Sequence, residues 1–372
     1  MRVAIDGLLL GGQHSGVELC IEELAGALGR LDLDCEIGLV CRPEYSLRAA
    51  KLGVEPLVAP WLTKYRSGRI LFEQLLMSRR LSSSGWGLLH GPGYVLPRNW
   101  TGPCVVTVYD LIALQYPQWC KPSNVMHYRM MVPASIAKAH AIIVPSETTA
   151  EAVRQRFPQA TDKLRVIFLG IGEQFRPVTD QRLIAHVRQK YRLPERFILC
   201  LGNLEPKKNL EAVVAAYEQI AEDVEVDLVI AGAKGWKCAG VLRRIEGSRV
   251  RARIVRTGPI AGTDLAPLYS SAELLIQWSL YEGVGLPPLE AMACGTPALV
   301  SDGGALKELA GQAAEVVELG PPEQLAEAIV RLLDDKDRCE QIVENGRNLA
   351  RQWTWRDHAR QVAALYREVA GA

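Results

Sequence analysis

Short apolar runs rich in valine, isoleucine and leucine recur along the first half of the chain, and segments with helical spacing lie between most of them. A second set of such runs follows in the other half. Buried strands that alternate with helices are typical of a parallel sheet covered by helices on both faces. The predicted strands are Arg2–Asp6, Glu36–Val40, Glu55–Val58, Gly87–His90, Cys104–Val108, Ala141–Val144 and Arg165–Phe168 in the first set, and Phe197–Leu201, Val226–Ala231, Ala252–Val255, Leu274–Gln277, Ala298–Val300 and Glu315–Glu318 in the second. The pattern therefore predicts an α/β protein with two doubly wound domains.

A segment that carries glycine and proline, Gly170–Pro177, separates the two sets and suits a linker. We predict a first domain over residues 1–175 and a second domain over residues 176–354. The last helical stretch, residues 355–370, has no partner strand, and we expect it to pack back onto the first domain. With 372 residues, the chain is long enough to bury two cores of ordinary size.

The composition is that of a soluble globular protein and limits the classes of partner. Hydrophobic residues make up 48% of the chain and the formal net charge is +1, so no overall attraction to nucleic acid is expected. No apolar run reaches the length of a membrane span, and we predict a cytoplasmic protein, with a peripheral contact at the inner face of the membrane as an open alternative. The segment Lys64–Leu81 mixes basic and apolar residues as an interfacial helix would, but an internal helix with a basic outer face is the favoured interpretation.

Residue types that bind metals do not form a recognisable site. The nine cysteines include no Cys-x-x-Cys pair and no Cys/His cluster with zinc spacing, so we expect reduced, buried thiols. Asp32 and Asp34 have the Asp-x-Asp form of a metal-bound diphosphate site, but they lie between a helix end and a strand rather than after a strand. We therefore predict neither a metal ion nor another cofactor.

The stretch Ser279–Pro297 combines two carboxylates with a glycine-rich loop after a predicted strand. Gly283 and Gly285 let the backbone approach a ligand closely, because neither has a Cβ. The prolines at positions 287 and 288 predict an extended entry into a helix that begins near Leu289.

The free backbone amides of this loop, those of Val284, Gly285 and Leu286, suit an anion, and phosphate is the best candidate. Glu282 precedes these donors and Glu290 follows them. A ligand that spans the loop therefore meets an acceptor for hydroxyl groups at each end. A nucleotide sugar has this layout.

Further polar groups stand after the strands of the second domain, where open parallel sheets bind ligands. Paired lysines between a glycine turn and a helix start favour a diphosphate, and backbone groups after a later strand could read the edge of a nucleobase. The residues concerned are Gly202, Asn203, Lys207 and Lys208 for the first loop, and Gly258, Pro259 and Ile260 for the second.

The strand ends of the first domain carry polar groups as well. Gly12 and His14, in the sequence GGQHSG, lie in a loop that leaves room for a substrate close to the backbone. His90 ends a strand and could position an acceptor or a proton, and Asp110, which follows Tyr109, could accept a hydrogen bond from a substrate hydroxyl. Capping and turn formation are alternative roles for His90 and Asp110.

Together these motifs resemble those of the retaining nucleotide-sugar glycosyltransferases of family four, which have the GT-B fold. The most specific motif is LYEGVGLPPLEAMACGTP, in which Glu282 and Glu290 match the E-x7-E signature of the family. Five further segments resemble other family landmarks in the expected order, namely GGQHSG, VVTVYDL, AIIVPSETT, VIFLGIGEQFRP and GNLEPKKN. The match therefore spans nearly the whole chain. The resemblance implies two Rossmann-like domains that face each other across a cleft, with the donor bound mainly by the second domain and the acceptor by the first.

The resemblance also implies roles for single residues. Glu282 would hydrogen-bond hydroxyls of the transferred sugar, and Glu290 the ribose. Lys208 matches the lysine that neutralises the leaving diphosphate, helped by the loop amides. Fixed donors and a cation aimed at the β-phosphate stabilise the charge that builds there, so no metal is required. The predicted catalytic residues are Glu282, Lys208, Asp110 and Tyr109, Gly12 is counted among the donor contacts, and His14, His90 and Tyr109 are the acceptor contacts.

Three positions depart from the usual family pattern. The family often has arginine where Asn203 stands, so a positive contact to the diphosphate is missing or is supplied by Lys207. It usually has histidine where Tyr109 stands, and a neutral tyrosine cannot titrate near pH 7 as histidine does. Val284 replaces a commonly aromatic residue, which alters the packing of the donor sugar.

The leading functional hypothesis is transfer of a sugar from a nucleoside diphosphate donor, GDP-mannose or a UDP-sugar, to a glycan or lipid-linked acceptor. Retention without an evident nucleophile suggests front-side attack, in which the leaving phosphate accepts the acceptor's proton. Glu282 as a nucleophile is the alternative mechanism. Two other functions stay open, namely a nucleotide-sugar epimerase of GT-B-like fold and a non-catalytic nucleotide-sugar-binding subunit.

Overall fold

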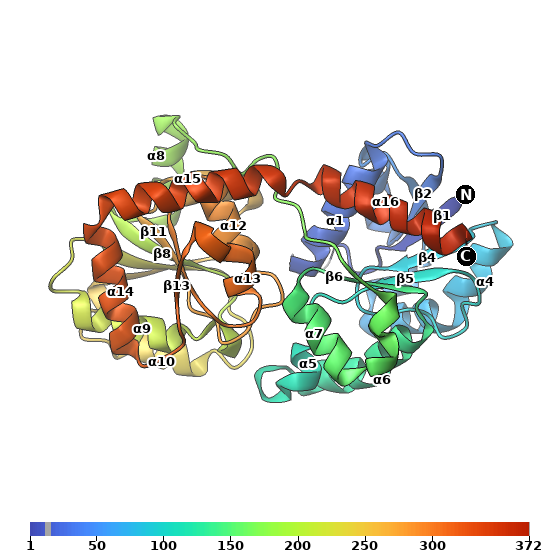
Figure 1. Ribbon diagram of the computed structural model, residues 1–372, viewed down its shortest axis with the longest axis horizontal. Helices are drawn as coiled ribbons and strands as arrows, with labels where there is room; N and C mark the ends of the chain where they lie inside the picture. Colours follow the sequence, from blue (N-terminus) through green and yellow to red (C-terminus); the bar gives the residue numbers. More distant parts are fainter. Residues whose placement is uncertain (12–15, 372) are drawn as a thin grey trace. The chain divides into compact units, whose positions relative to one another are not determined.

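The computed structural model describes residues 1–11 and 16–371, which form two compact α/β units (Figure 1). Unit 1 consists of residues 1–117, 122–170 and the segment from Thr354 onwards, and unit 2 consists of residues 118–121 and 171–353. The chain passes from unit 1 to unit 2 after Gly170, a few residues before the boundary predicted at residue 175.

Unit 1 contains a parallel sheet of seven strands in the order β3-β2-β1-β4-β5-β6-β7. Its strands are β1 Arg2–Asp6, β2 Glu36–Cys41, β3 Glu55–Val58, β4 Leu88–Gly91, β5 Cys104–Thr107, β6 Ala141–Val144 and β7 Leu164–Val166. Its helices are α1 Gly16–Gly29, α2 Ser46–Lys51, α3 Arg66–Leu71, α4 Met77–Ser83, α5 Ile112–Gln115, α6 Pro122–Lys138, α7 Glu147–Arg156 and α16 Trp355–Gly371, with a π-helical turn, η3 Phe72–Leu76, between α3 and α4. Short 3-10 turns are η1 Pro43–Tyr45, η2 Trp61–Lys64 and η5 Pro158–Lys163, and η4 Pro117–Trp119 begins in unit 1 and continues into residues of unit 2.

Unit 2 contains a second parallel sheet, of six strands in the order β10-β9-β8-β11-β12-β13. Its strands are β8 Phe197–Leu201, β9 Asp227–Ala231, β10 Ile254–Gly258, β11 Leu274–Gln277, β12 Ala298–Ser301 and β13 Glu315–Val317. Its helices are α8 Gln181–Tyr191, α9 Leu210–Ile220, α10 Ala239–Glu246, α11 Leu265–Ser270, α12 Leu286–Ala293, α13 Leu306–Ala310, α14 Pro322–Asp334 and α15 Lys336–Gln352. Short 3-10 turns are η6 Pro206–Lys208, η7 Arg251–Arg253, η8 Gly262–Asp264 and η9 Gly311–Ala313.

Both faces of the second sheet are buried. Successive residues of a strand point to opposite faces, and in β8 Ile198 packs in one apolar cluster while Leu199 packs in another. The first cluster contains residues of α9, α10 and α14, and the second contains residues of α8, α11, α12 and α13. The strands are therefore continuous apolar runs, and the predicted doubly wound α/β architecture is confirmed. None of the described helices combines the length and the apolar composition that a membrane crossing needs.

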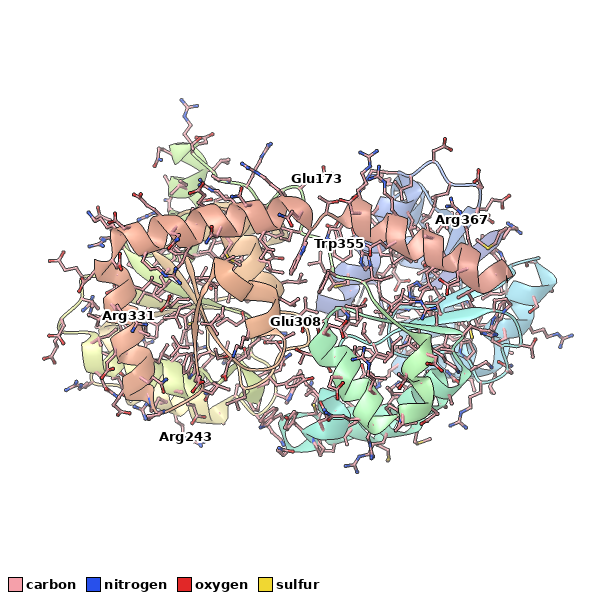
Figure 2. The ribbon with its side chains drawn as sticks, in the orientation of Figure 1. Glu173, Arg243, Glu308, Arg331, Trp355 and Arg367 are labelled. Atoms are coloured by element: carbon pink, nitrogen blue, oxygen red, sulfur yellow. The ribbon has the colours of Figure 1, made fainter. Side chains whose placement is uncertain are left out.

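The carboxyl-terminal helix α16 belongs to unit 1, although it follows the last helix of unit 2 in the chain. It begins at Trp355, which Figure 2 labels, and a Cβ on Gly170 would lie only 2.1 Å from the Trp355 backbone nitrogen. His358 Nδ1 lies 2.8 Å from the carbonyl oxygen of Phe168. This backbone approach explains why a glycine stands where the chain leaves unit 1.

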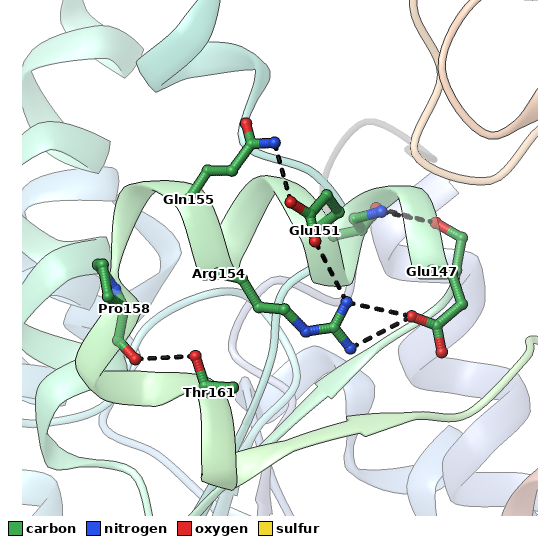
Figure 3. Close-up of polar contacts among 8 residues, drawn as sticks. Glu147, Glu151, Arg154, Gln155, Pro158 and Thr161 are labelled. Carbon is green, nitrogen blue, oxygen red and sulfur yellow. Dashed lines mark hydrogen bonds and ion pairs between the residues drawn. The ribbon is translucent and has the colours of Figure 1, made fainter.

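Helix α7 follows β6 and holds the loop after β5 in place. Ser146 caps the helix by accepting a hydrogen bond from the Thr149 amide, and the Thr149 hydroxyl donates to the Tyr109 carbonyl at 3.1 Å. On the outer face, Arg154 pairs with Glu147 and Glu151 (Figure 3). The AIIVPSETT motif thus orders the backbone beside Tyr109.

Candidate functional site

Glu282 is the centre of a buried polar cluster in unit 2, and the residue is 6% exposed. Lys208 Nζ lies 2.7 Å from its Oε1, and Lys207 Nζ lies 2.9 Å from its Oε2. Oε1 also accepts hydrogen bonds from Gln277 Nε2 at 3.1 Å and from Ser279 Oγ at 2.9 Å. Two cations and two neutral donors therefore surround one carboxylate.

The charge of this carboxylate is stable at neutral pH. Burial alone would raise the pKa of Glu282, but the charges of Lys207 and Lys208 outweigh it and lower the pKa to about 2. Glu282 therefore acts as an acceptor of hydrogen bonds and not as an acid. Among the residues that the structure describes, only Lys207 donates to Oε2, so this oxygen keeps a lone pair for a hydroxyl group.

The two lysines are delivered by the turn between β8 and α9. The chain leaves β8 at Gly202, where φ is +144°, and a Cβ there would approach Lys208 Cε to 3.0 Å. The lysines end the 3-10 turn η6, and Asn209 follows it in the left-handed conformation with φ +50°. The Lys207 carbonyl accepts a hydrogen bond from the Leu280 amide at 2.7 Å, which joins this turn to the Glu282 loop.

The loop after β12 wraps around the Glu282 segment. A Cβ on Gly304, where φ is +64°, would meet the Glu282 carbonyl oxygen at 2.3 Å, and one on Gly303 would meet the Ser279 carbonyl oxygen at 2.2 Å. The Ala305 amide donates to the Glu282 carbonyl at 2.8 Å. The sequence analysis did not predict this loop, although glycines soon after a predicted strand are the signal that marked the other loops.

Helix α12 begins at Leu286, so the helix start predicted near Leu289 is wrong. The prolines at 287 and 288 lie in its first turn rather than in an extended entry. The physical reason is that amides of the first turn have no partner within a helix, so proline loses no hydrogen bond there.

The predicted donor cluster lies at this helix start. Gly285 is the N-cap residue in the left-handed conformation, with φ +91°, and a Cβ there would lie 2.5 Å from Leu306 Cδ2. Within residues 16–371, the amides of Val284, Gly285 and Leu286 have no hydrogen-bond acceptor. These three donors can therefore bind an anion without breaking a bond in the protein.

Glu290 lies on the buried side of α12 and is bonded to a neighbour. Its Oε2 accepts a hydrogen bond from the Tyr269 hydroxyl of α11 at 2.6 Å. The sequence around Tyr269 carries no signal for this role, because a buried tyrosine on a short helix is a common core residue. The ribose contact predicted for Glu290 stays a prediction.

Asn203 lies beside the lysines and is exposed. Its side chain forms a hydrogen bond with Glu205. Burial raises the pKa of Glu205 more than the charges of Lys207 and Lys208 lower it, so the pKa is raised overall. Glu205 is a further carboxylate near the lysines, and it was not among the site residues predicted from the sequence.

The end of β10 is part of the same sheet edge. The Gly258 carbonyl accepts a hydrogen bond from the Gly232 amide at 2.8 Å, and a Cβ on Gly232 would meet the Gly202 carbonyl oxygen at 2.0 Å. Ile260, after Pro259, packs against the apolar cluster that contains Tyr269. The sheet order places β10 two strands from β8, and the nucleobase contact predicted for Gly258, Pro259 and Ile260 stays a prediction.

Comparisons with known proteins agree with this geometry. A family model described as "Glycosyltransferase Family 4" matches residues 14–175, and one described as "Glycosyl transferases group 1" matches residues 184–349. The chain belongs to glycosyltransferase family four. This glycosyltransferase is 26% identical over 283 residues to O-antigen chain mannosyltransferase B of Escherichia coli, a match that covers 75% of this chain and 74% of that protein.

Two further comparisons concern extent and fold. The glycosyltransferase is 33% identical over 218 residues to the serotype-specific mannosyltransferase WbdA of Escherichia coli, which covers 57% of this chain but only 26% of WbdA. The crystal structure of HepE from Anabaena in complex with UDP and glucose has a TM-score of 0.77 and 19% identity, and covers 99% of this chain and 100% of that one. The fold of the glycosyltransferase is GT-B.

His90 of the glycosyltransferase is a core residue, contrary to the acceptor contact predicted for it. The side chain is fully buried, with Nδ1 2.6 Å from the Tyr366 hydroxyl of α16 and Nε2 2.8 Å from Thr107 Oγ1. Burial lowers the pKa of His90 to about 3, so the ring is neutral. A helix from the far end of the chain covers this strand end, and the local sequence does not reveal it.

Tyr109 and Asp110 lie together after β5. Tyr109 is buried, its hydroxyl bonds to Cys20 of α1, and burial followed by the Cys20 contact raises its pKa well above the usual range. Asp110 Oδ1 accepts a hydrogen bond from the Ile112 amide at 3.1 Å, so the side chain has the turn-forming role that was one of its two predicted roles. Contacts of these residues with a substrate stay predictions, and Gly12 and His14 lie outside the described residues.

Proposed function

We propose that the glycosyltransferase is a retaining, metal-independent enzyme that moves a hexose from a nucleoside diphosphate donor to a glycan or lipid-linked acceptor. The observation that carries the proposal is the buried Glu282 carboxylate with two lysines at 2.7 and 2.9 Å, beside three open amides. A diphosphate needs fixed positive groups, and a sugar needs a hydroxyl acceptor next to them. The positive groups and the hydroxyl acceptor both lie in the loops that follow β8 and β11 of unit 2.

The leaving diphosphate would lie against Lys208, Lys207 and the amides at the start of α12. Negative charge builds on the β-phosphate as its bond to the sugar breaks, so these donors stabilise the transition state more than the ground state. Lys207 would supply the cation that the family resemblance leads us to expect at position 203, where this chain has asparagine. This assignment is supported by its ion pair with Glu282, which fixes its Nζ in the site.

The sugar would donate a hydroxyl hydrogen bond to Oε2 of Glu282, the oxygen with an open lone pair. Glu290 would bind the ribose, in which case its bond to Tyr269 must be shared or exchanged. With the sugar held at one carboxylate and the ribose at the other, the diphosphate would lie against the lysines and amides between them. This is the order of groups in a nucleoside diphosphate sugar.

Front-side attack fits the state of Glu282 better than covalent catalysis. A nucleophilic carboxylate needs an oxygen free to bond to carbon, but Oε1 already has three donors, and the open lone pair of Oε2 is assigned here to a hydroxyl of the sugar. In the front-side step the bond between the sugar carbon and the phosphate oxygen breaks, the acceptor oxygen bonds to the same face of that carbon, and the acceptor proton passes to a phosphate oxygen. Lys208 then balances the charge of the departing diphosphate.

The names of the related proteins favour particular candidates for the donor sugar and its base. Two of the related proteins are named as mannosyltransferases, which favours mannose and with it GDP-mannose. The HepE structure contains UDP, so a UDP-sugar stays a candidate donor. We place the reaction in the cytoplasm, where nucleotide sugars are available as donors.

Thermal-shift measurements with UDP, GDP, TDP and ADP test the proposal first, followed by incubation of the matching nucleotide sugar with candidate glycans. We expect one base to stabilise the protein, and chelation of divalent metals to leave turnover unchanged. Lys208→Ala should weaken donor binding by about 1.5–3 kcal/mol, because it removes a charge-assisted hydrogen bond. Lys336→Ala, at an exposed lysine of the same unit, is the matched control.

The alternatives have distinct results in the same assays. An epimerised sugar without nucleotide release would identify an epimerase and overturn glycosyl transfer. Tight donor binding with no turnover on any acceptor would identify a binding subunit. An unchanged affinity and rate in Lys208→Ala would remove that residue from the site.

A further inference from the structure

The helical segment from Arg66 to Ser83 in unit 1 exposes apolar side chains on its outer face. Its inner face is buried through Phe72, Met77 and Leu81. On the outer face, Leu71, Leu75 and Leu76 are 52%, 58% and 49% exposed. An amphipathic surface helix normally turns its leucines to the core, so three exposed leucines within six positions are unusual.

A π-helical turn explains why the apolar residues do not share one face. The turn η3, Phe72–Leu76, adds a residue to the helical repeat between α3 and α4 and so rotates the residues after it relative to those before it. The sequence pattern favoured an internal helix with a basic outer face. The outer face is instead both basic and apolar.

Aromatic and methionine side chains extend the exposed apolar area. Trp61 and Tyr65, in and after η2, are 73% and 60% exposed and touch edge to face, with ring centroids 6.4 Å apart. On α6, Met126 and Met130 are one helical turn apart and are both more than half exposed. Arg66 at the start of α3 donates to Asn124 Oδ1 of α6 at 3.1 Å, which links the two segments.

The charge of this area is one-sided. Lys64, Arg66, Arg79, Arg80 and Arg129 are all exposed. The only acidic residue within residues 61–83 and 122–138 is Glu73, and it is buried. The chain as a whole has a formal net charge of only +1, so positive charge is concentrated here and is not a general property of the surface.

We propose that the exposed side chains of residues 61–80 and 126–130, here called the docking surface, bind the anionic face of a lipid bilayer. Leucine and methionine side chains enter the boundary between headgroups and acyl chains, tryptophan and tyrosine sit at headgroup level, and arginine and lysine contact lipid phosphates. A protein partner of matching chemistry would need a dense acidic patch with apolar residues between its charges, whereas an anionic bilayer offers both at every point. This inference rests on unit 1 alone and goes beyond the proposed reaction.

Vesicle flotation tests the docking surface with the full chain. We expect partition onto vesicles that contain phosphatidylglycerol and phosphatidylcholine, little partition onto phosphatidylcholine alone, and weakening by salt. Arg79→Gln/Arg80→Gln should lower the partition about 25-fold, because each basic residue near an anionic leaflet contributes about a fivefold factor. Leu75→Ser/Leu76→Ser should lower it about tenfold or more through lost apolar burial.

Matched controls exist elsewhere on the chain. Leu47→Ser/Leu183→Ser changes two exposed leucines, and Arg182→Gln/Arg192→Gln changes two exposed arginines, all outside the docking surface. Both controls should partition like the wild type. A blue shift of tryptophan emission on vesicle binding that is reduced in Trp61→Phe would place this residue in the bilayer. Nucleoside diphosphate binding should be unchanged in every variant, which separates this test from that of the proposed reaction.

Three results would overturn the inference. The first is no partition onto anionic vesicles. The second is equal partition of the docking-surface variants and their controls. The third is a dimer in analytical ultracentrifugation that Leu75→Ser/Leu76→Ser dissociates, without vesicle binding, which would assign the surface to a second copy of the chain.

Discussion

Replacing Glu282 by glutamine should release two lysines from a carboxylate that holds them in the free enzyme. The variant keeps the shape of the side chain and removes its charge. Lys207 and Lys208 would then face each other without an anion between them. We expect the variant to be less stable than the wild type, to bind nucleoside diphosphates more tightly, and to turn over slowly.

The magnitude follows from the pKa of Glu282. The lowering from the usual 4.5 to about 2, at about 1.4 kcal/mol for each pKa unit, corresponds to about 3 kcal/mol of stabilisation of the ionised form. Because the folded-state pKa is lowered, this contribution is complete above pH 4.5 and is lost as the pH falls towards 2. In a domain of this size, about 3 kcal/mol corresponds to a decrease in Tm of about 6–12 °C.

Ligand binding should change in the opposite direction. In the wild type, a diphosphate competes with Glu282 for the lysines, and release of one lysine takes about half of that stabilisation, or about 1.5 kcal/mol. The variant avoids this cost, so UDP or GDP should bind about tenfold more tightly. Turnover should fall, because the hydroxyl acceptor for the transferred sugar loses its charge.

Differential scanning fluorimetry at pH 7 and pH 4, calorimetric titration with the preferred nucleoside diphosphate, and a nucleotide-release assay measure the three effects. Glu327→Gln, at an exposed carboxylate of the same unit, is the control. A Glu282→Gln variant as stable as the wild type at pH 7 would contradict the stabilising ion pairs of Glu282. Weaker diphosphate binding together with full turnover would contradict both the competition for the lysines and the sugar contact.

Further variants test other parts of the structure. Lys207→Ala should weaken donor binding, and addition of Asn203→Arg should restore part of it in a calorimetric titration, because an arginine there returns a cation to the lysine cluster; no recovery would place Lys207 outside the diphosphate contact. Gly304→Ala should lower Tm and turnover together, since its Cβ would lie 2.3 Å from the Glu282 carbonyl oxygen, and a fully active variant would show that the loop can move aside. Glu73→Gln should raise Tm more at pH 8 than at pH 5. Burial, followed by the charge of Asp6, raises the pKa of Glu73, so the wild type loses stability as the pH rises above the pKa of a free glutamate. An equal change in Tm at both pH values would contradict a buried, protonated Glu73.

Much of the site could be predicted because its signals are local. Glu282, the lysine pair and the glycine turns lie in segments that lead from predicted strands to the next helices, and Glu290 lies in the helix after one of them. The carboxyl ends of parallel strands meet at one sheet edge. The start of α12 was misplaced because proline disfavours a helix interior but suits a first turn. The same pair of prolines can therefore stand before a helix or within its first turn, and the local sequence does not distinguish the two. The loop at Gly303 and Gly304 carried a usable signal and was overlooked.

The rest depended on contacts between distant residues. His90 has the sequence of a strand-end histidine, but Tyr366, 276 residues away, buries it. The leucines of residues 71–76 have helical spacing, and only the π turn and the packing of α3 and α4 decide that they face solvent. The sequence by itself determined the two sheets and the chemistry of the donor loops, because strand runs, glycine turns and paired charges are short-range patterns. Only the tertiary structure decided that one oxygen of Glu282 is saturated and the other open, because that depends on side chains brought together from β8, β11 and the loops after them.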